Sequence, residues 1–206
     1  MVAEAIVHVR AVTASNTLGM VVDVGCGKLR HFHSLRQYAD ELVLVDTRAQ
    51  IDAVHTDGDL KYTIASFVNA HQGRKHRLRV VAADQFETTL LAADVAFSVA
   101  TFDIVPGRLR GRMLRAIARN LRTDGFFILI VPRNDSTILR RCGPRNRRWD
   151  GHWFANRNGF TFYRNFRGTR ALVRSVQASG MILEADLSRY RQVCLIFRYR
   201  AGNSRG

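Results

Sequence analysis

Three aspartates follow or end three apolar runs of the sequence, at points where a parallel sheet would bring them together. Asp23 precedes Gly25 by two residues, Asp46 ends the second apolar run, and Asp84 follows the third. The carboxyl ends of parallel strands meet along one edge of a sheet, so we expect the three carboxylates to share one crevice. Carboxylates placed there can bind hydroxyl groups, amino groups and cations.

A turn that contains two glycines follows the first aspartate, in the run Val21-Val22-Asp23-Val24-Gly25-Cys26-Gly27-Lys28. Glycine lets a backbone approach a bound molecule closely, where a Cβ would clash. A pyrophosphate site would avoid the carboxylate of Asp23, whereas a ligand with an amino group and a sulfonium cation would be attracted to it. Asp46 can accept hydrogen bonds from both hydroxyls of a ribose.

These residues have two other interpretations. A nicotinamide-binding Rossmann protein also has an acid after its second strand, but its fingerprint needs a glycine where Arg30 stands and has no use for Asp23. Any one of the aspartates could equally cap a helix or a turn. Three of them at successive strand ends favour a shared binding site.

Apolar runs alternate with helical patterns along the whole chain, which predicts an α/β fold. We expect a Rossmann-like, doubly wound, seven-stranded and mostly parallel sheet with helices on both faces. The last two strands are joined by too short a segment for a parallel crossover, so the last strand should be antiparallel. The predicted strands are 20–24, 41–46, 78–83, 94–99, 126–131, 181–187 and 192–199. The predicted helices are 29–40, 62–70, 86–92, 107–121 and 169–179, after an N-terminal helical segment at 1–19.

With these elements in place, the sequence resembles the class I S-adenosylmethionine-dependent methyltransferases. The resemblance covers about residues 5–200, and it departs from the family at Leu29, where a third glycine is common. It implies methyl transfer from S-adenosylmethionine by in-line displacement, with S-adenosylhomocysteine as the product. The matching pieces are Asp23-Val24-Gly25-Cys26-Gly27, Asp46, Ala83-Asp84-Gln85-Phe86 and Asp94-Val95-Ala96-Phe97-Ser98-Val99.

The resemblance also implies a role for each matching residue. Gly25 and Gly27 would pack under the methionine part of the cofactor, and Asp23 would orient its amino group. Asp46 would bind the ribose, while Asp84 and Phe86 would hold the adenine. The run Ser98 to Ala100 would line the methyl-transfer site. The full predicted cofactor set is Asp23, Gly25, Cys26, Gly27, Asp46, Thr47, Asp84, Gln85, Phe86, Ser98, Val99 and Ala100.

The composition predicts one globular domain over residues 1–206, since 47% of the residues are hydrophobic and 24% are charged. No apolar run reaches the roughly 20 residues of a membrane-spanning helix, and the first ten residues lack the basic leader of a secretory signal. Three cysteines with unrelated spacings fit neither a disulfide framework nor a zinc site. We therefore expect a cytoplasmic protein without a metal.

Basic residues are in strong excess, with 32 Lys and Arg against 17 Asp and Glu and a net charge of +15. Such an excess favours anionic partners such as nucleic acid, although a GC-rich genome would enrich arginine without any functional selection. One arginine series lies on one side of the helix predicted at 107–121, and we interpret it as a solvated face. Its members are Arg108, Arg112, Arg115, Arg119 and Arg122.

Residues 133–168 form an insertion after the fifth strand, at the same edge of the sheet as the aspartates. The insertion holds nine arginines, two aspartates and both tryptophans. Asn158-Gly159 is typical of a two-residue hairpin turn, so we predict a hairpin over 152–166 that covers the site. The predicted pairing sets Phe154 opposite Tyr163 and Trp153 opposite Arg164.

The insertion leaves the acceptor open between two classes. Arginines among aromatic residues suit RNA, through phosphate contacts and base stacking. A lid over a small anionic or aromatic molecule explains the same residues, and so does a satellite core with a solvated edge. A non-catalytic nucleic-acid-binding module on the same fold is a further alternative. The candidate substrate-binding residues are Arg133, Asn134, Trp153, Phe154, Tyr163 and Arg164, and the candidate bases are His152, Tyr163 and Asp135.

Overall fold

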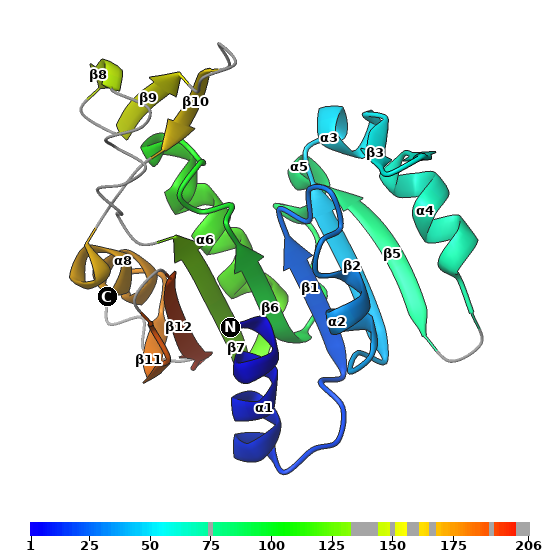
Figure 1. The fold of residues 1–206 in the computed structure, drawn as a ribbon. Helices are drawn as coiled ribbons and strands as arrows, with labels where there is room; N and C mark the ends of the chain where they lie inside the picture. The colour runs from blue at the N-terminus through cyan, green and yellow to red at the C-terminus, as the bar shows by residue number, and fades with distance from the viewer. Residues whose placement is uncertain are drawn as a thin grey trace.

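The computed structural model describes residues 1–73, 76–132, 168–189 and 192–200, together with the backbone of three short strands between 144 and 164. A seven-stranded mixed sheet runs through the centre of the molecule (Figure 1). Its strands are β1 (Met20–Val24), β2 (Glu41–Asp46), β5 (Arg77–Ala82), β6 (Ala93–Val99), β7 (Leu121–Pro132), β11 (Met181–Asp186) and β12 (Gln192–Tyr199).

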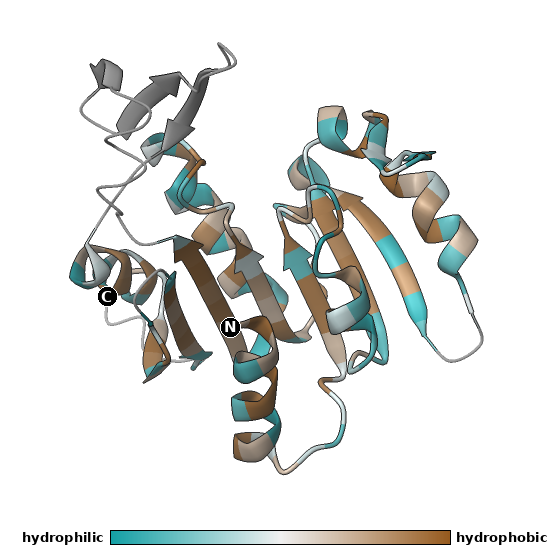
Figure 2. Ribbon diagram, in the orientation of Figure 1, coloured by the Kyte–Doolittle hydropathy of each residue, from teal (hydrophilic) through white to brown (hydrophobic). Residues whose placement is uncertain are grey.

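The strand order is β11-β12-β7-β6-β1-β2-β5. β12 is antiparallel to both of its neighbours, and the other neighbouring pairs are parallel. The predicted doubly wound sheet with an antiparallel last strand is therefore confirmed. Figure 2 shows that the inner strands are hydrophobic along most of their length, as expected for strands that are covered on both faces.

Helices cover both faces of the sheet, and each face has its own apolar core. On one face, buried side chains of α1 (Val2–Thr13), α2 (Phe32–Arg36) and α4 (Ile64–His71) pack together with the sheet. On the other face, α5 (Ala83–Phe86), α6 (Gly107–Asn120) and α8 (Thr169–Gln177) do the same. A short helix and a hairpin between β2 and α4 were not predicted: α3 (Arg48–Asp52), β3 (His55–Asp57) and β4 (Leu60–Tyr62).

Two helices near the site differ from their predicted ranges. α2 begins at Phe32 and not at 29, because Leu29 has the left-handed backbone angle φ 58° and so cannot belong to a right-handed helix. α5 begins at Ala83, three residues earlier than predicted, directly after β5. This earlier start puts Asp84 and Gln85 into the first helical turn.

The predicted arginine series is solvated; its first four members lie on α6 and the fifth, Arg122, lies in β7. All five of its members are exposed. Glu87 accepts a bond from Arg112 at 2.6 Å, and Arg122 forms an ion pair with Asp94. Arg110 of the same helix is buried instead: its Nε donates to the carbonyl of Val105 at 3.1 Å.

The insertion contains a three-stranded antiparallel sheet of β8 (Pro144–Arg148), β9 (Gly151–Ala155) and β10 (Thr161–Arg164). The predicted hairpin register is wrong by one residue, because Phe154 pairs with Phe162 and Trp153 pairs with Tyr163. The nearest pair to the turn is Ala155 and Thr161. An odd number of residues separates them, whereas a two-residue turn requires an even number. The predicted cover over the site lies outside the described residues.

Within the described part of the chain, no helix is long and apolar enough to cross a membrane. Cys26 and Cys194 are buried free thiols. Among the described residues there is no group of three or more His, Cys, Asp or Glu side chains that could hold a metal ion.

Candidate active site

The turn after β1 is fastened to the neighbouring strands by backbone hydrogen bonds. The N–H groups of Gly25 and Cys26 donate to the carbonyl of Val45 at 2.7 and 3.1 Å. From the other side, the hydroxyl of Thr101 donates to the carbonyl of Gly25 at 3.0 Å. Gly25 has φ 81°, and a Cβ there would overlap the Thr101 side chain. Only glycine fits at this position.

Two more residues of the turn have left-handed backbones, Gly27 with φ 51° and Leu29 with φ 58°. A Cβ on Gly27 would meet only the Gly25 carbonyl, at 3.9 Å, and would otherwise project into open space. Leu29 stands where the resembled family commonly has its third glycine. It keeps the conformation that glycine favours, while its side chain is buried in the core. The departure at Leu29 therefore leaves the shape of the turn intact.

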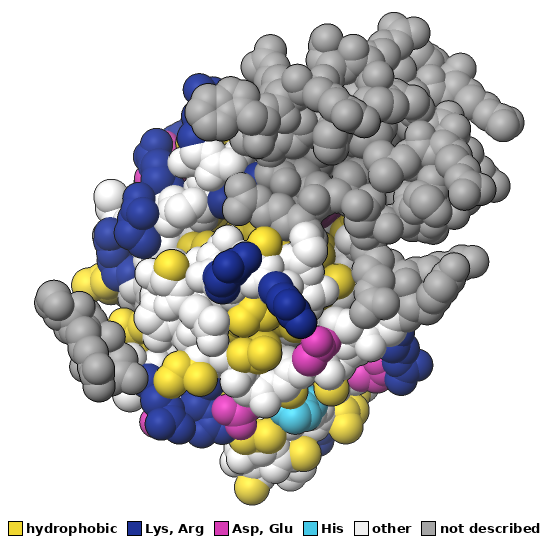
Figure 3. All heavy atoms as spheres, turned by 90° about the vertical axis from the view of Figure 1, so that its left-hand side faces the viewer, with side chains coloured by type: hydrophobic (Ala, Val, Ile, Leu, Met, Phe, Trp, Pro, Cys, Tyr) yellow, Lys and Arg dark blue, Asp and Glu magenta, His cyan; other side chains and the backbone are white. Residues whose placement is uncertain are grey.

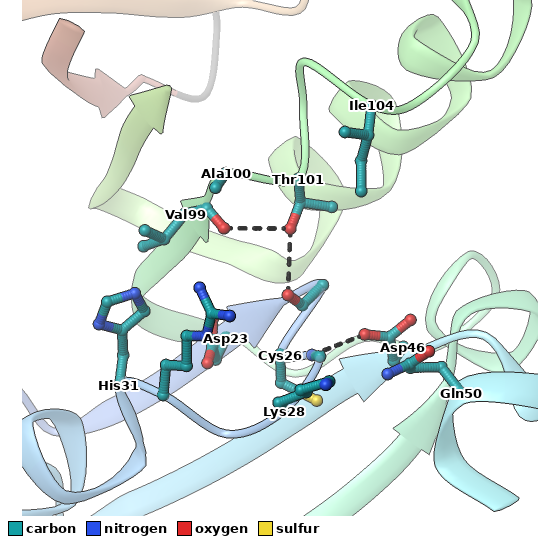
Figure 4. Close-up of a pocket in the computed structure, with 13 residues that line it drawn as sticks. Asp23, Cys26, Lys28, His31, Asp46, Gln50, Val99, Ala100, Thr101 and Ile104 are labelled. Carbon is teal, nitrogen blue, oxygen red and sulfur yellow. Dashed lines mark hydrogen bonds between the residues drawn. The ribbon is translucent and has the colours of Figure 1, made fainter. Parts of the chain in front are cut away.

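This turn borders a cavity of about 340 Å³ at the carboxyl ends of β1, β2 and β6. In Figure 4, Asp46 and Gln50 lie on one side of the cavity, and His31 and Val99 lie on the opposite side. The lining residues are Asp23, Gly25, Cys26, Gly27, Lys28, Arg30, His31, Asp46, Gln50, Val99, Ala100, Thr101 and Ile104.

Asp23 is the buried acid of the cavity, with only 2% of its surface exposed. Burial, and after it the negative charge of Asp46, raise the pKa of Asp23 to about 7. The carboxylate thus changes charge near neutral pH, and a cation bound beside it would favour the ionised form. Burial also raises the pKa of the neighbouring Cys26 thiol, which keeps that thiol protonated.

Asp46 is held in place by the turn itself. The N–H of Gly27 donates to its Oδ2 and the N–H of Thr47 donates to its Oδ1, both at 2.8 Å. A carboxylate oxygen can accept two hydrogen bonds, so each oxygen keeps one site for a ligand. Asp46 is thus oriented to accept two hydrogen bonds from adjacent hydroxyl groups.

Asp84 differs from the other two acids, because its side chain is 64% exposed and pairs with Arg48 at 3.1 Å. The hydrogen bond from the Arg48 guanidinium lowers the pKa of Asp84. Phe86 lies in the apolar core with 3% of its surface exposed. It packs in the core on the α6 face of the sheet and does not line the cavity.

Seven of the twelve predicted cofactor residues line the cavity, and five do not. Besides Asp84 and Phe86, these five include Thr47, which caps α3 by accepting from the Gln50 N–H at 3.3 Å. The Gln85 side chain accepts from the Ala82 N–H at 3.4 Å, and Ser98 is fully buried in β6.

Six cavity residues were missed by the sequence interpretation. Lys28, Arg30 and His31 directly follow the glycine turn, and this adjacency was the signal that could have found them. Thr101 and Ile104 follow the fourth strand in the same way. Gln50 lies on α3, which was not predicted, so no signal in the sequence pointed to it.

The structure describes no side chain of the predicted substrate-binding residues or of the candidate bases. Arg133, Asn134 and Asp135 lie outside the described residues. The strands β9 and β10 contain the others, but their side chains lie outside the described part as well. These others are His152, Trp153, Phe154, Tyr163 and Arg164.

No protein-family model and no curated protein matches the sequence. Solved structures match nearly all of it. A methyltransferase dependent on S-adenosylmethionine from Clostridium acetobutylicum is 9% identical over 97% of this chain and 91% of that chain, with a TM-score of 0.68. A second one, from Methanosarcina mazei, is 13% identical over 88% and 92%, with a TM-score of 0.65. The chain has the class I methyltransferase fold.

A third methyltransferase structure contains small molecules. The 1,6-didemethyltoxoflavin-N1-methyltransferase of Burkholderia thailandensis is 16% identical over 97% of this chain and 76% of that chain, with a TM-score of 0.62. That structure holds 1,6-didemethyltoxoflavin and S-adenosylhomocysteine. At these identities the likeness concerns the fold, so the function of this chain has to be argued from its own cavity.

Proposed function

We propose that this chain is an S-adenosylmethionine-dependent methyltransferase that binds its cofactor in the cavity at the ends of β1, β2 and β6. One observation carries the proposal: in a methyltransferase fold, this cavity joins a buried acid, an oriented acid and a glycine turn. Asp23, Asp46 and Gly27 supply these three features.

The donor set of the cavity fits that cofactor. Asp46 offers one free acceptor site on each oxygen, which matches the two hydroxyls of a ribose. Asp23 offers a buried carboxylate for an amino group. The open space over Gly27 lets the ligand approach the backbone, where a side chain would stand in its way. Gln50 lies beside Asp46 and is our candidate for a polar contact at the adenosine end.

S-adenosylmethionine supplies an electrophilic methyl group when it is bound. The residues of the chain then act by positioning, which can provide much of the rate of an in-line displacement. Asp23 would hold the amino group and Asp46 the ribose, on either side of the sulfonium, and Val99 and Ala100 supply apolar side chains to the same cavity. A proton acceptor is needed only if the acceptor molecule starts protonated.

We propose a small molecule as the acceptor. Support comes from the small ring compound that the Burkholderia structure holds together with S-adenosylhomocysteine. On the face shown in Figure 3, Lys and Arg side chains form a run along the upper left edge and stand in smaller groups elsewhere. Arg112 and Arg122 are already paired with acidic side chains, which weakens the described surface as a phosphate-binding face.

Calorimetry with S-adenosylhomocysteine tests the cofactor site. We expect the wild-type chain and the Asp59→Ala variant to bind it, because Asp59 is exposed and lies away from the cavity. Asp46→Ala should lose the binding. Binding of NAD in place of S-adenosylhomocysteine would overturn the proposal.

Incubation with methyl-labelled S-adenosylmethionine and a cell extract tests the acceptor. After separation by size, label in the small-molecule fraction supports the proposal. Label in a large fraction that ribonuclease removes would instead identify RNA as the acceptor. Binding of S-adenosylhomocysteine without label in any fraction would favour a non-catalytic binding module.

A further inference from the structure

His31 is the one histidine among the residues that line the cavity. It caps the N-terminal end of α2 and is half-buried, and Figure 4 shows it beside Val99, across the cavity from Asp46. From the ribose, the cofactor continues through the sulfonium to its amino-acid end. If Asp46 binds the ribose, His31 lies on the sulfonium side of it, next to Val99, which belongs to the run that the resemblance assigns to the methyl-transfer site.

Neither ring nitrogen of His31 is hydrogen-bonded to another described residue. Three other histidines in the described ranges each use a ring nitrogen on a backbone carbonyl: His55 at 3.0 Å, and His71 and His76 at 2.8 Å. His31 thus keeps a ring nitrogen available to a molecule in the cavity.

The surroundings of His31 favour the neutral ring. Burial, and after it the charges of Arg30 and of the α-amino group at the chain start, lower its pKa from the ordinary 6.5. The other charged groups that line the same cavity are Asp23 of β1, Asp46 of β2 and Lys28 of the turn, and the lining residues that follow β6 are uncharged. A neutral imidazole has the lone pair that a proton acceptor needs.

We infer that His31 accepts the proton that a hydroxyl group of the acceptor loses in the proposed methyl transfer. The inference rests on the proposed function. The acceptor oxygen forms a bond to the methyl carbon, and the carbon–sulfur bond breaks with its electron pair going to sulfur. The O–H bond breaks and its proton passes to a ring nitrogen of His31, which later releases it to water. The products are the O-methylated acceptor, S-adenosylhomocysteine and one proton.

This assignment narrows the acceptor class. A tertiary amine, a thioether or a pyridine-like nitrogen carries a free lone pair and needs no proton acceptor. A hydroxyl group does need one, because it is protonated near neutral pH. The other role open to His31 is to bind the carboxylate of the cofactor. Lys28 and Arg30 are better suited to that role, since both are cationic at neutral pH and line the same cavity.

The test compares His31→Gln with His33→Gln, a matched control two positions along, because His33 is exposed and does not line the cavity. Three properties are measured: affinity for S-adenosylhomocysteine, acylation of each histidine by diethyl pyrocarbonate, and label transfer to the small-molecule extract between about pH 5 and pH 9. Diethyl pyrocarbonate reacts with neutral imidazole, so its readout does not depend on catalysis.

We expect His31→Gln to bind S-adenosylhomocysteine within about twofold of wild type and to transfer methyl groups on the order of 100-fold more slowly. At saturating S-adenosylmethionine, where the ionisation of Asp23 no longer limits binding, the wild-type rate should rise with pH and level off below pH 6.5, and this rise should be absent from His31→Gln. His31 should be acylated in the wild-type chain, and the label should be recovered on oxygen.

Other outcomes overturn the inference. Activity of His31→Gln equal to that of His33→Gln would remove His31 from the reaction, and label on nitrogen or sulfur would remove the hydroxyl acceptor. A loss of S-adenosylhomocysteine affinity in His31→Gln would make it a cofactor-binding residue. Failure of the wild-type chain to bind S-adenosylhomocysteine would instead refute the proposed function itself, so the two failures are distinct.

Discussion

The carboxyl ends of β1 and of β5 each place an aspartate at the same edge of the sheet, yet the two carboxylates have opposite surroundings. Asp23 in the first is buried, and its pKa is raised to about 7. Asp84 in the second is exposed, and its hydrogen bond from Arg48 lowers its pKa. One acid is held close to protonation at neutral pH, and the other is held in its ionised form.

The position of each strand in the sheet explains the difference. β1 lies between β2 and β6, and both neighbours contribute to the wall around the turn that follows it. β5 is the edge strand, so one side of the turn after it has no neighbouring strand. The order of the strands, and not the residue type, therefore decides which of the two acids is removed from water.

The largest effect should come from removing the charge of Asp23. Its pKa is 3.8 in an exposed chain and about 7 in the folded protein. Between pH 3.8 and pH 7, the folded state therefore keeps a proton on Asp23 that the unfolded chain has released. Wild-type stability should fall as pH rises through that window, and the cost should be complete above pH 7. Each factor of ten in proton affinity is worth about 1.4 kcal/mol, which puts the cost on the order of 4 kcal/mol.

Asp23→Asn cannot ionise, so its stability relative to wild type should increase across the same window. Urea unfolding at several pH values measures this difference, and Asp59→Asn serves as the exposed control. Wild-type affinity for S-adenosylhomocysteine should rise with pH near 7 because the amino group needs an ionised partner, and Asp23→Asn should bind weakly throughout. A stability difference that does not change with pH would show that Asp23 ionises normally.

The next largest effect should come from Gly25→Ala, which tests how closely the turn after β1 is packed. The new Cβ would overlap the Thr101 side chain, and the alanine would have to adopt φ 81°. We expect a loss of about 3 kcal/mol in the free energy of unfolding, from overpacking together with left-handed strain.

Gly58→Ala is the matched control, because Gly58 has φ 57° and nothing within 4 Å of an added Cβ. It should show the strain alone, about 1 kcal/mol. Equal losses in the two variants, measured by urea unfolding, would mean that Thr101 moves away without cost and that the turn is loosely packed.

A smaller effect should separate two substitutions of Leu29. Leu29→Ala and Leu29→Gly remove the same buried side chain, but only alanine has to bear the left-handed φ of 58°. We therefore expect Leu29→Gly to be about 1 kcal/mol more stable than Leu29→Ala in thermal or urea unfolding.

Leu35 supplies the control for this comparison, since it is fully buried in the right-handed helix α2. There the order should reverse, because alanine is favoured over glycine by about 1 kcal/mol inside a helix. The same order at both positions would mean that the conformation of Leu29 adds no strain.

The apolar pattern of the sequence predicts strands better than it predicts the site. The bounds of β1, β2 and β12 agree with the prediction, because a strand covered on both faces reads as an unbroken apolar run. Helix starts near the site were wrong because they depend on single backbone angles and side-chain contacts. The φ of Leu29 delays α2, and no composition rule reports it.

For the same reason, the sequence could place the acids at strand ends but could not say which of them borders the cavity. That distinction depends on strand order and on where α5 begins. Phe86 ends α5 and lies in the core. His31 and Thr101 were missed because neither belongs to a pattern, although both lie next to one.

The smallest effect should come from Asp84→Asn. This variant could overturn the comparison between the carboxyl ends of β1 and β5. Both partners of its ion pair are more than 60% exposed, so the pair should contribute little to stability and less at high salt. The small stabilisation from this ion pair should be present above pH 3.8 and should be lost as pH falls through the lowered pKa of Asp84. Affinity for S-adenosylhomocysteine should change by less than about threefold, and Arg48→Gln should behave alike. If Asp84→Asn lost as much affinity for S-adenosylhomocysteine as Asp46→Ala, while Arg48→Gln kept the wild-type affinity, Asp84 would have to leave Arg48 when the ligand binds. The exposed acid would then belong to the site, and strand order would govern only the free protein.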